Sequence, residues 1–420
     1  MGTYASVALG ILGTVVAARS LHGQGYGLFA TALVAASFFQ TLLDLTAEES
    51  LTKYGFTYVT AGDWGRLRRL FGLALRLKLA GGLLAAAALL ILAPFGKDVF
   101  GGSITAPLFV IAALPLVQAP ENVATSALLL RERYDVRALF LTVSMGLRLL
   151  GIAIGSHFGV TEALVGVVAA QLVATTAVGT AGLIAFRRFP VGRPVPLGDD
   201  RRPVTRFVLQ SSFATGMLSL RTALAPLLLG VVANPTQLGF FKIAQAPQNG
   251  LASLSAPFRM ILLTEQTRDW ERGQHGDVVR GVVRYTLAAA GLMVISLPFL
   301  FWLMPDLIRI VFGREFVGAT QAARIILFAG AIQLVLGWTK SIPVSIGRPK
   351  LRILTHGIET MVLLPLVIVF GAAWHATGAA IALLVSTIVF ALVWAVLFAR
   401  LRRQVESGRT VARPEEALVS

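Results

Sequence analysis

The residues from Thr377 to Ala399 read TGAAIALLVSTIVFALVWAVLFA, and Arg400-Leu401-Arg402-Arg403 follows directly. No charged side chain occurs within this stretch. An α-helix of this length rises about 35 Å at about 1.5 Å per residue, which is enough to cross the ~30 Å hydrocarbon core of a bilayer. The stretch therefore predicts a membrane-spanning helix that ends at a basic cluster.

Similar apolar stretches recur along the whole chain. Hydrophobic residues make up 56% of the sequence and charged residues only 14%, whereas a soluble domain carries about 25% charged residues. Lipid must therefore solvate much of the surface, and we predict an all-α polytopic membrane protein with about 12 transmembrane helices. The predicted spans lie near Gly2–Ala18, Gly27–Leu51, Leu70–Ala93, Ile104–Leu130, Ala138–Ser156, Glu162–Phe186, Phe207–Ala233, Leu238–Leu263, Tyr285–Met304, Gly318–Ile346, Ile353–Trp374 and Thr377–Ala399.

The positions of lysine and arginine give the orientation of these spans. Short cytoplasmic loops retain positive charge, and 25 of the 37 basic residues fall in alternate loops and the C-terminal tail. The intervening loops hold only four, which are Arg19, Lys97, Arg309 and Arg314. We therefore expect a multi-pass protein of the cytoplasmic (inner) membrane with both termini in the cytoplasm. The net charge of +16 then reflects topology, so a nucleic-acid partner is not expected.

An internal repeat divides the chain into two halves. The proline- and arginine-rich stretch 187–206 is the longest polar linker, and it separates a predicted six-helix bundle at 1–186 from a second at 207–400, with a cytoplasmic tail at 401–420. At an offset near 212, Gln24–Phe29 aligns with Thr236–Phe241, and Phe100-Gly101 aligns with Phe312-Gly313. An even number of spans in each half implies a parallel repeat about an axis along the membrane normal, with a cavity between the bundles.

Two motifs resemble a known family of transporters. One is Gly25-Tyr26-Gly27-Leu28-Phe29, and the other is Leu307–Phe316 followed by Ile346-Gly347-Arg348-Pro349-Lys350. Together with the twelve-span plan they resemble the polysaccharide flippases, of the O-antigen flippase type, in the multidrug/oligosaccharidyl-lipid/polysaccharide exporter superfamily. The resemblance implies export of an undecaprenyl-pyrophosphate-linked oligosaccharide by alternating access, without an ATP-binding domain. The implied partners are that lipid-linked oligosaccharide, membrane lipid, and a polysaccharide polymerase or glycosyltransferases of the same pathway.

Polar side chains within the predicted spans indicate the walls of such a cavity, because an ionisable group in the bilayer core needs a function or a partner. The second span carries polar residues on one arc of about 100° at helical spacing, and the eighth carries a similar arc. These residues are Ser37, Gln40, Thr41, Asp44 and Glu48 in the second span, and Lys242, Gln245, Asn249 and Ser253 in the eighth. The same face is thus acidic in the first half and basic in the second.

Basic side chains on these spans suit a pyrophosphate group through charge-assisted hydrogen bonds. We expect Arg221, which precedes a proline kink at Pro226, to join Lys242, Gln245, Asn249 and Arg259 in binding substrate. Asp44 and Glu48 are the candidate ion-coupling or gate residues. A structural role remains open, because Arg259, Asp44 and Glu48 lie near span ends where side chains snorkel or pair. Four further charged residues are expected to pair between helices: Glu121, Arg148, Lys340 and Glu359.

Two other functions remain open. A drug/cation antiporter of the same superfamily predicts an acidic cavity, whereas Arg221, Lys242 and Arg259 are basic. A membrane-embedded polysaccharide polymerase or ligase needs catalytic residues on a sizeable outer loop, but the outer loops here are short. The chain contains no cysteine and five scattered histidines, and no P-loop, HExxH or G-x-S-x-G pattern occurs. We therefore expect no enzyme activity, no cofactor and no metal site.

Overall fold

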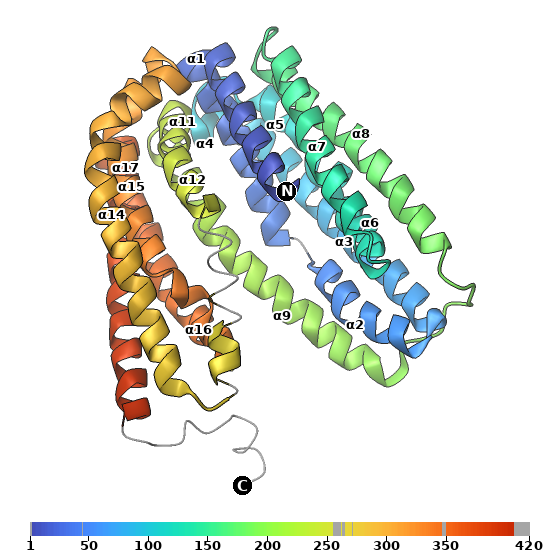
Figure 1. Ribbon diagram of the computed structural model, residues 1–420. Helices are drawn as coiled ribbons and strands as arrows, with labels where there is room; N and C mark the ends of the chain where they lie inside the picture. Colours follow the sequence, from blue (N-terminus) through green and yellow to red (C-terminus); the bar gives the residue numbers. More distant parts are fainter. Residues whose placement is uncertain are drawn as a thin grey trace. The chain divides into compact units, whose positions relative to one another are not determined.

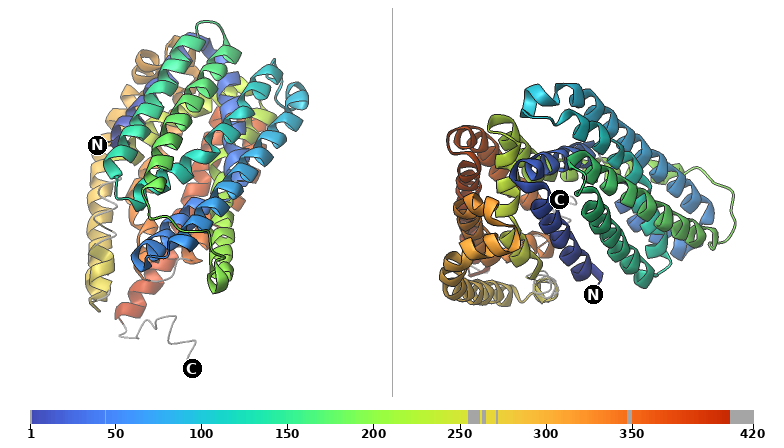
Figure 2. Two further views of the ribbon diagram at one scale, coloured as in Figure 1. Left: turned by 90° about the vertical axis from the view of Figure 1, so that its right-hand side faces the viewer. Right: turned by 90° about the horizontal axis from the view of Figure 1, so that it is seen from above.

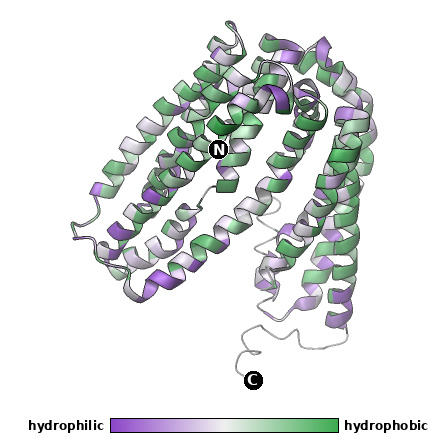
Figure 3. Cartoon of the chain, turned by 180° about the vertical axis from the view of Figure 1, so that it is seen from behind, coloured by the Kyte–Doolittle hydropathy of each residue, from purple (hydrophilic) through white to green (hydrophobic). Residues whose placement is uncertain are grey.

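A computed structural model describes residues 2–43, 45–254, 262, 265–270, 272–346 and 350–406. Over these residues the secondary structure is helical and includes no β-strand (Figure 1). Hydrophobic residues form the middle of most helices, and hydrophilic residues gather at ends such as the C-terminal end of α17 (Figure 3). The predicted all-α membrane fold is confirmed.

The chain forms two compact units, Met1–Gly239 and Phe240–Ser420. The helices of the first unit are α1 (Gly2–Leu43), α2 (Ala47–Ala61), α3 (Trp64–Leu92), η1 (Ala93–Phe95), α4 (Gly96–Phe100), α5 (Thr105–Ile111), α6 (Ala113–Leu130), α7 (Tyr134–Gly155), α8 (Val160–Arg187), η2 (Gly198–Asp200), α9 (Arg201–Ser219), the π-helical η3 (Leu220–Leu224) and α10 (Ala225–Val232). Helix α11 (Pro235–Ala244) crosses the boundary. In this unit α8 lies beside both α6 and α7, and α3 beside α6 (Figures 1 and 2).

The second unit contains α12 (Ala246–Leu254), α14 (His275–Val311), η4 (Arg314–Ala319), α15 (Thr320–Val335), η5 (Gly337–Lys340), α16 (Ile342–Ser345) and α17 (Lys350–Glu406). Helix α15 packs against both α14 and α17. Both units therefore bury their cores between long adjacent helices.

The described helices agree with twelve spans, although within the described ranges only nine continuous segments are long and apolar enough to cross a membrane. Two of these segments, Tyr4–Leu43 and Leu351–Glu406, contain 40 and 56 residues, which is about twice the length that one crossing needs. Each is interrupted by a histidine with positive φ, His22 (φ 60°) and His375 (φ 55°). Each therefore supplies two spans, and the broken helix formed by α11 and α12 supplies the twelfth.

The internal repeat is visible in the backbone conformation. Gly101 ends α4 with φ 73° and ψ 168°, and Gly313 lies between α14 and η4 with φ 113° and ψ 166°. Both glycines follow a phenylalanine, and the repeat offset separates them. An L-residue rarely adopts positive φ, so both halves use glycine for the same turn. The repeat offset predicted from sequence therefore describes equivalent structural positions.

The repeat-related glycines Gly27 and Gly239 lie directly against each other. A Cβ atom built on Gly239 would lie 3.0 Å from the Cα of Gly27, and one built on Gly27 would lie 2.5 Å from the carbonyl oxygen of Pro235. No side chain fits between two backbones that approach so closely, as in small-residue crossings of membrane helices. The glycines of the predicted motif thus allow α1 and α11 to cross.

We expect Gly27→Ala to lower the free energy of unfolding by about 1–3 kcal/mol, because the added methyl group forces the two backbones apart. Thermal unfolding of the purified protein in detergent measures this loss. Gly72→Ala is the matched control, because a Cβ atom at Gly72 meets no atom within 4 Å. Equal stability of the two variants would contradict the close crossing.

The polar linker is fixed to the first unit. The amide of Val195 donates to the carbonyl of Gly65 (3.2 Å), and the ring of Trp64 stacks on Phe189 at 5.8 Å. Asp200 accepts hydrogen bonds from the Tyr58 hydroxyl (3.0 Å) and from the guanidinium of Arg66 (3.3 Å). The first compact unit extends beyond the linker and includes α9 and α10. The repeat boundary at 187–206 stays a prediction from sequence.

Candidate functional site

The predicted second span is not one continuous helix. The sequence predicted a helix over Gly27–Leu51, but α1 ends at Leu43 and α2 begins at Ala47. Asp44, a predicted coupling residue, lies at this interruption and outside the described residues. A discontinuous membrane helix leaves backbone groups that side chains or ligands must satisfy. The break therefore creates a polar position within an apolar helix bundle.

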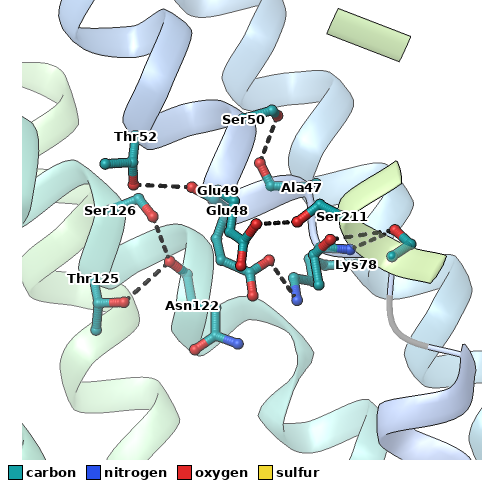
Figure 4. A network of polar contacts seen from close by, with 12 residues as sticks. Ala47, Glu48, Glu49, Ser50, Thr52, Lys78, Asn122, Thr125, Ser126 and Ser211 are labelled. Atoms are coloured by element: carbon teal, nitrogen blue, oxygen red, sulfur yellow. Dashed lines mark hydrogen bonds and ion pairs between the residues drawn. The ribbon is translucent and has the colours of Figure 1, made fainter. Parts of the chain in front are cut away.

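A buried ion pair lies beside this break. The Nζ atom of Lys78, on α3, lies 2.6 Å from Oε2 of Glu48 in the first turn of α2. The Lys78 side chain is 3% exposed and that of Glu48 is 24% exposed. Figure 4 shows these side chains pointing toward each other, with Asn122 of α6 nearby. The carboxylate is also well placed at a helix N-terminus, where the helix dipole favours negative charge.

Helix α9 is bonded to both sides of the break. The Ser211 hydroxyl donates to the carboxylate of Glu49 (Figure 4), and the Ser212 hydroxyl accepts from the backbone amide of Thr46 at 3.0 Å. Further along α9, the Ser219 hydroxyl donates to the carbonyl of Phe38 at 3.2 Å. The Ser212 bond satisfies a backbone amide at the break, and the other two serines tie α9 to α2 and α1.

Arg221 lies in a π-helical turn. The turn η3 covers Leu220–Leu224 and precedes Pro226 near the start of α10. A proline removes one backbone donor and clashes with the preceding turn, and single π-helical turns are frequent at functional sites. The local deviation predicted at Pro226 therefore occurs as a π-turn that contains Arg221.

A second set of polar contacts joins the helices of the first unit. Gln40 donates to Gln118 at 3.1 Å, which links α1 to α6. The Gln171 amide donates to Glu121 at 2.6 Å and to Thr175 at 3.0 Å. Because α6 carries Glu121 and α8 carries Gln171, the predicted role of Glu121 as an interhelical partner is confirmed.

The predicted polar residues of the second half lie along α11 and α12. The Lys242 ammonium group donates to the Gln245 side chain at 3.4 Å, so these two predicted site residues are neighbours. Gln245 lies between the two helices, and its backbone carbonyl accepts from the amide of Asn249 at 3.0 Å. All three therefore follow one side of a nearly continuous helix, while Arg259 lies outside the described residues.

Side-chain amides extend this polar side through the second unit. Gln248 on α12 donates to Gln333 on α15 at 3.1 Å. Gln333 in turn donates to the hydroxyl of Thr387 on α17 at 3.3 Å. Amide and hydroxyl groups both donate and accept hydrogen bonds without charge. These side chains can therefore pair with one another, as they do here, or with the hydroxyl groups of a sugar.

The two polar networks are related by the repeat. At the repeat offset of 212 residues, Gln333 is equivalent to Glu121 and Thr387 is equivalent to Thr175. Both halves thus place a polar side chain at the same position of the fourth and sixth spans. The first half has a carboxylate where the second has an amide, so the second half is neutral at this position.

The structure tests the predicted site only in part. Lys242, Gln245 and Asn249 are brought together, whereas Arg221 belongs to the first compact unit, so its convergence with them stays a prediction. Glu48 is paired with Lys78, which is not among the predicted site residues. A lysine in the middle of the apolar span Leu70–Ala93 was the available signal. Within the described ranges, no group of three or more potential metal ligands occurs.

Comparison with known structures defines the class of this fold. An inward-facing multidrug resistance MATE family transporter of the MOP superfamily matches with a TM-score of 0.74 and 14% identity, over 97% of this chain and 96% of its own. Lipid II flippase MurJ, in an inward closed conformation, matches with a TM-score of 0.69 and 14% identity, over 96% and 89%. A MOP superfamily transporter from Pyrococcus furiosus matches with a TM-score of 0.61 and 13% identity, over 97% and 93%. The chain therefore has the MOP transporter fold.

A family model gives the narrower assignment. The model of the polysaccharide biosynthesis protein family matches residues 1–262, which is more than half of the chain. No curated protein matches the sequence. The chain belongs to the polysaccharide biosynthesis protein family, and the predicted resemblance to flippases of this superfamily is confirmed.

We expect Lys78→Met to lower the free energy of unfolding by about 3–5 kcal/mol, because the Glu48 carboxylate is left without its buried counter-charge. The double variant Glu48→Gln/Lys78→Met should recover most of this loss. Thermal unfolding in detergent of both single variants and the double variant measures the coupling. Lys97→Met, at an exposed position, is the control, and additive effects of the two single changes would refute the pair.

Proposed function

We propose that this protein flips a lipid-linked oligosaccharide, with an undecaprenyl-pyrophosphate carrier, across the cytoplasmic membrane by alternating access for polysaccharide biosynthesis. The observation that carries the proposal is the polar side of α11 and α12, where Lys242 lies 3.4 Å from Gln245 and Gln248 continues into Gln333 and Thr387. A cation next to a series of amides matches a substrate that joins a pyrophosphate to sugars.

The chemistry of each group suits one part of that substrate. The ammonium group of Lys242 and the guanidinium groups of Arg221 and Arg259 form charge-assisted hydrogen bonds with phosphate oxygens. Amide side chains such as Gln245 and Asn249 both donate and accept, as sugar hydroxyls require. The polyprenyl chain stays in the bilayer, because its transfer into a polar cavity would cost about 0.8 kcal/mol for each methylene group.

The driving force need not include a chemical step. Outward movement of a negative charge from an inside-negative cell releases about 2.3 kcal/mol per charge for each 100 mV. Antiport of a proton or sodium ion through Asp44 or Glu48 is a second source of energy that the proposal allows. Since Glu48 holds Lys78, its proposed role is that of a gate whose ion pair opens and closes with the helix break.

The main alternative is an antiporter for cationic drugs with the same fold. A Pyrococcus furiosus transporter of this superfamily has been described as having a binding pocket of reverse polarity that suggests a different function. Pocket polarity is therefore a useful discriminator within this fold. The basic residues Arg221 and Lys242 favour an anionic substrate here, with a polysaccharide polymerase or glycosyltransferases as partners on the same pathway.

We expect Lys242→Gln to weaken binding of undecaprenyl-pyrophosphate oligosaccharide about tenfold or more, because a hydrogen bond to a charged group contributes about 1.5–3 kcal/mol. Lys242→Arg retains the charge and should bind within about threefold of the wild type. Equilibrium binding to the purified protein measures these constants, and Lys97→Gln is the charge-matched control. Unchanged binding by Lys242→Gln would remove this residue from the site.

A further inference from the structure

The second unit contains an aromatic-walled cavity that is separate from the polar side of α11 and α12. Its volume is about 230 Å³. Trp338 of η5 and Trp394 and Phe398 of α17 line it, together with Arg400 and Gln404 at the C-terminal end of α17. Trp338 meets Trp394 edge to face at 5.6 Å and contacts Phe398 at 5.0 Å. The cavity therefore has rigid aromatic walls and a basic end.

Both tryptophans carry a buried donor that the protein does not use. Trp338 is 3% exposed and Trp394 is 2% exposed. Neither indole Nε1 atom has a hydrogen-bond partner within the described part of the chain. Buried indole N–H groups normally find an acceptor, and an unsatisfied one costs about 1–3 kcal/mol. Both residues therefore wall the cavity with their rings, while their N–H groups are covered and have no acceptor within the described part of the chain.

The charge at the same cavity indicates the kind of ligand that suits it. Arg400 is exposed, and no ion-pair partner for it occurs among the described residues. It follows directly on the apolar stretch of α17, so it lies at the level where lipid headgroups meet the acyl chains. Leu397 and Leu401, which also line the cavity, are apolar. The cavity thus combines an aromatic and apolar wall with one cation at its end.

We propose that this cavity binds an anionic phospholipid of the phosphatidylglycerol type. The phosphate pairs with Arg400, and the glycerol ester region lies against the rings of Trp338 and Trp394. The first part of an acyl chain packs against the aromatic and leucine side chains. Basic pockets between membrane helices at the cytoplasmic side are known to bind anionic lipid headgroups. This site is independent of the proposed transport substrate.

The test uses the two tryptophans as reporters. In a full-length variant with Trp64, Trp270, Trp302 and Trp374 changed to Phe, only Trp338 and Trp394 remain as tryptophan fluorophores. We expect brominated phosphatidylglycerol in mixed micelles to quench this emission saturably, with an apparent affinity at least fivefold higher than that of brominated phosphatidylcholine. Added inorganic phosphate should not relieve the quenching, because the acyl chain also contributes to binding.

Two arginine variants separate a specific site from bulk lipid contact. Arg400→Gln should remove the preference for phosphatidylglycerol, whereas Arg403→Gln, an exposed control that does not line the cavity, should keep it. Quenching that is equal for both lipids, or absent because only water fills the cavity, would overturn the proposal. So would a preference that survives in Arg400→Gln.

A second measurement avoids the multiple tryptophan changes. Native mass spectrometry of the wild-type protein, released from detergent with equal amounts of phosphatidylglycerol and phosphatidylethanolamine, should show retained phosphatidylglycerol. Arg400→Gln should reduce that retention about fivefold and Arg403→Gln should not. Equal retention by wild type and Arg400→Gln would contradict the site even if transport is normal.

Discussion

Hydrogen bonding of the backbone inside a hydrocarbon solvent is the constraint on which the rest of this structure depends. Each unpaired amide or carbonyl in lipid costs several kcal/mol, so a membrane helix can stop only where other groups replace its bonds. At the interruption between Leu43 and Ala47, side chains supply part of this replacement. Ser212 satisfies the amide of Thr46, and the Glu48–Lys78 pair places opposite charges beside the same point. Contacts from α9 and α3 therefore stabilise the break.

The internal repeat shows how one scaffold accommodates two chemistries. Gly101 and Gly313 form the same positive-φ turn in both halves, and Thr175 and Thr387 accept from a glutamine amide in both. The equivalent acidic and amide positions, Glu121 and Gln333, differ in charge. The two halves thus share backbone geometry and differ in the charge of one equivalent position.

Periodicity and charge in the sequence were sufficient for the fold, because lipid imposes length and burial on every span. The twelve spans and the repeat offset follow from those rules. The break after Leu43 could not be predicted in this way, since the same residues read as a continuous apolar helix. Lys78 was missed for a related reason: its partner, Glu48, becomes visible only when α3 lies beside α2. The proximity of Lys242 and Gln245 was predictable, because they lie about one turn apart on one helix.

The sidedness of lipid-linked glycan in proteoliposomes tests the central claim most directly. Liposomes that contain undecaprenyl-pyrophosphate oligosaccharide are prepared with and without the purified protein, and an enzyme added outside cleaves only the exposed glycan. The account predicts that the inner-leaflet glycan becomes accessible only when the protein is present. Glycan that stays inaccessible while the same vesicles transport a small cationic drug would contradict it and identify a drug antiporter instead.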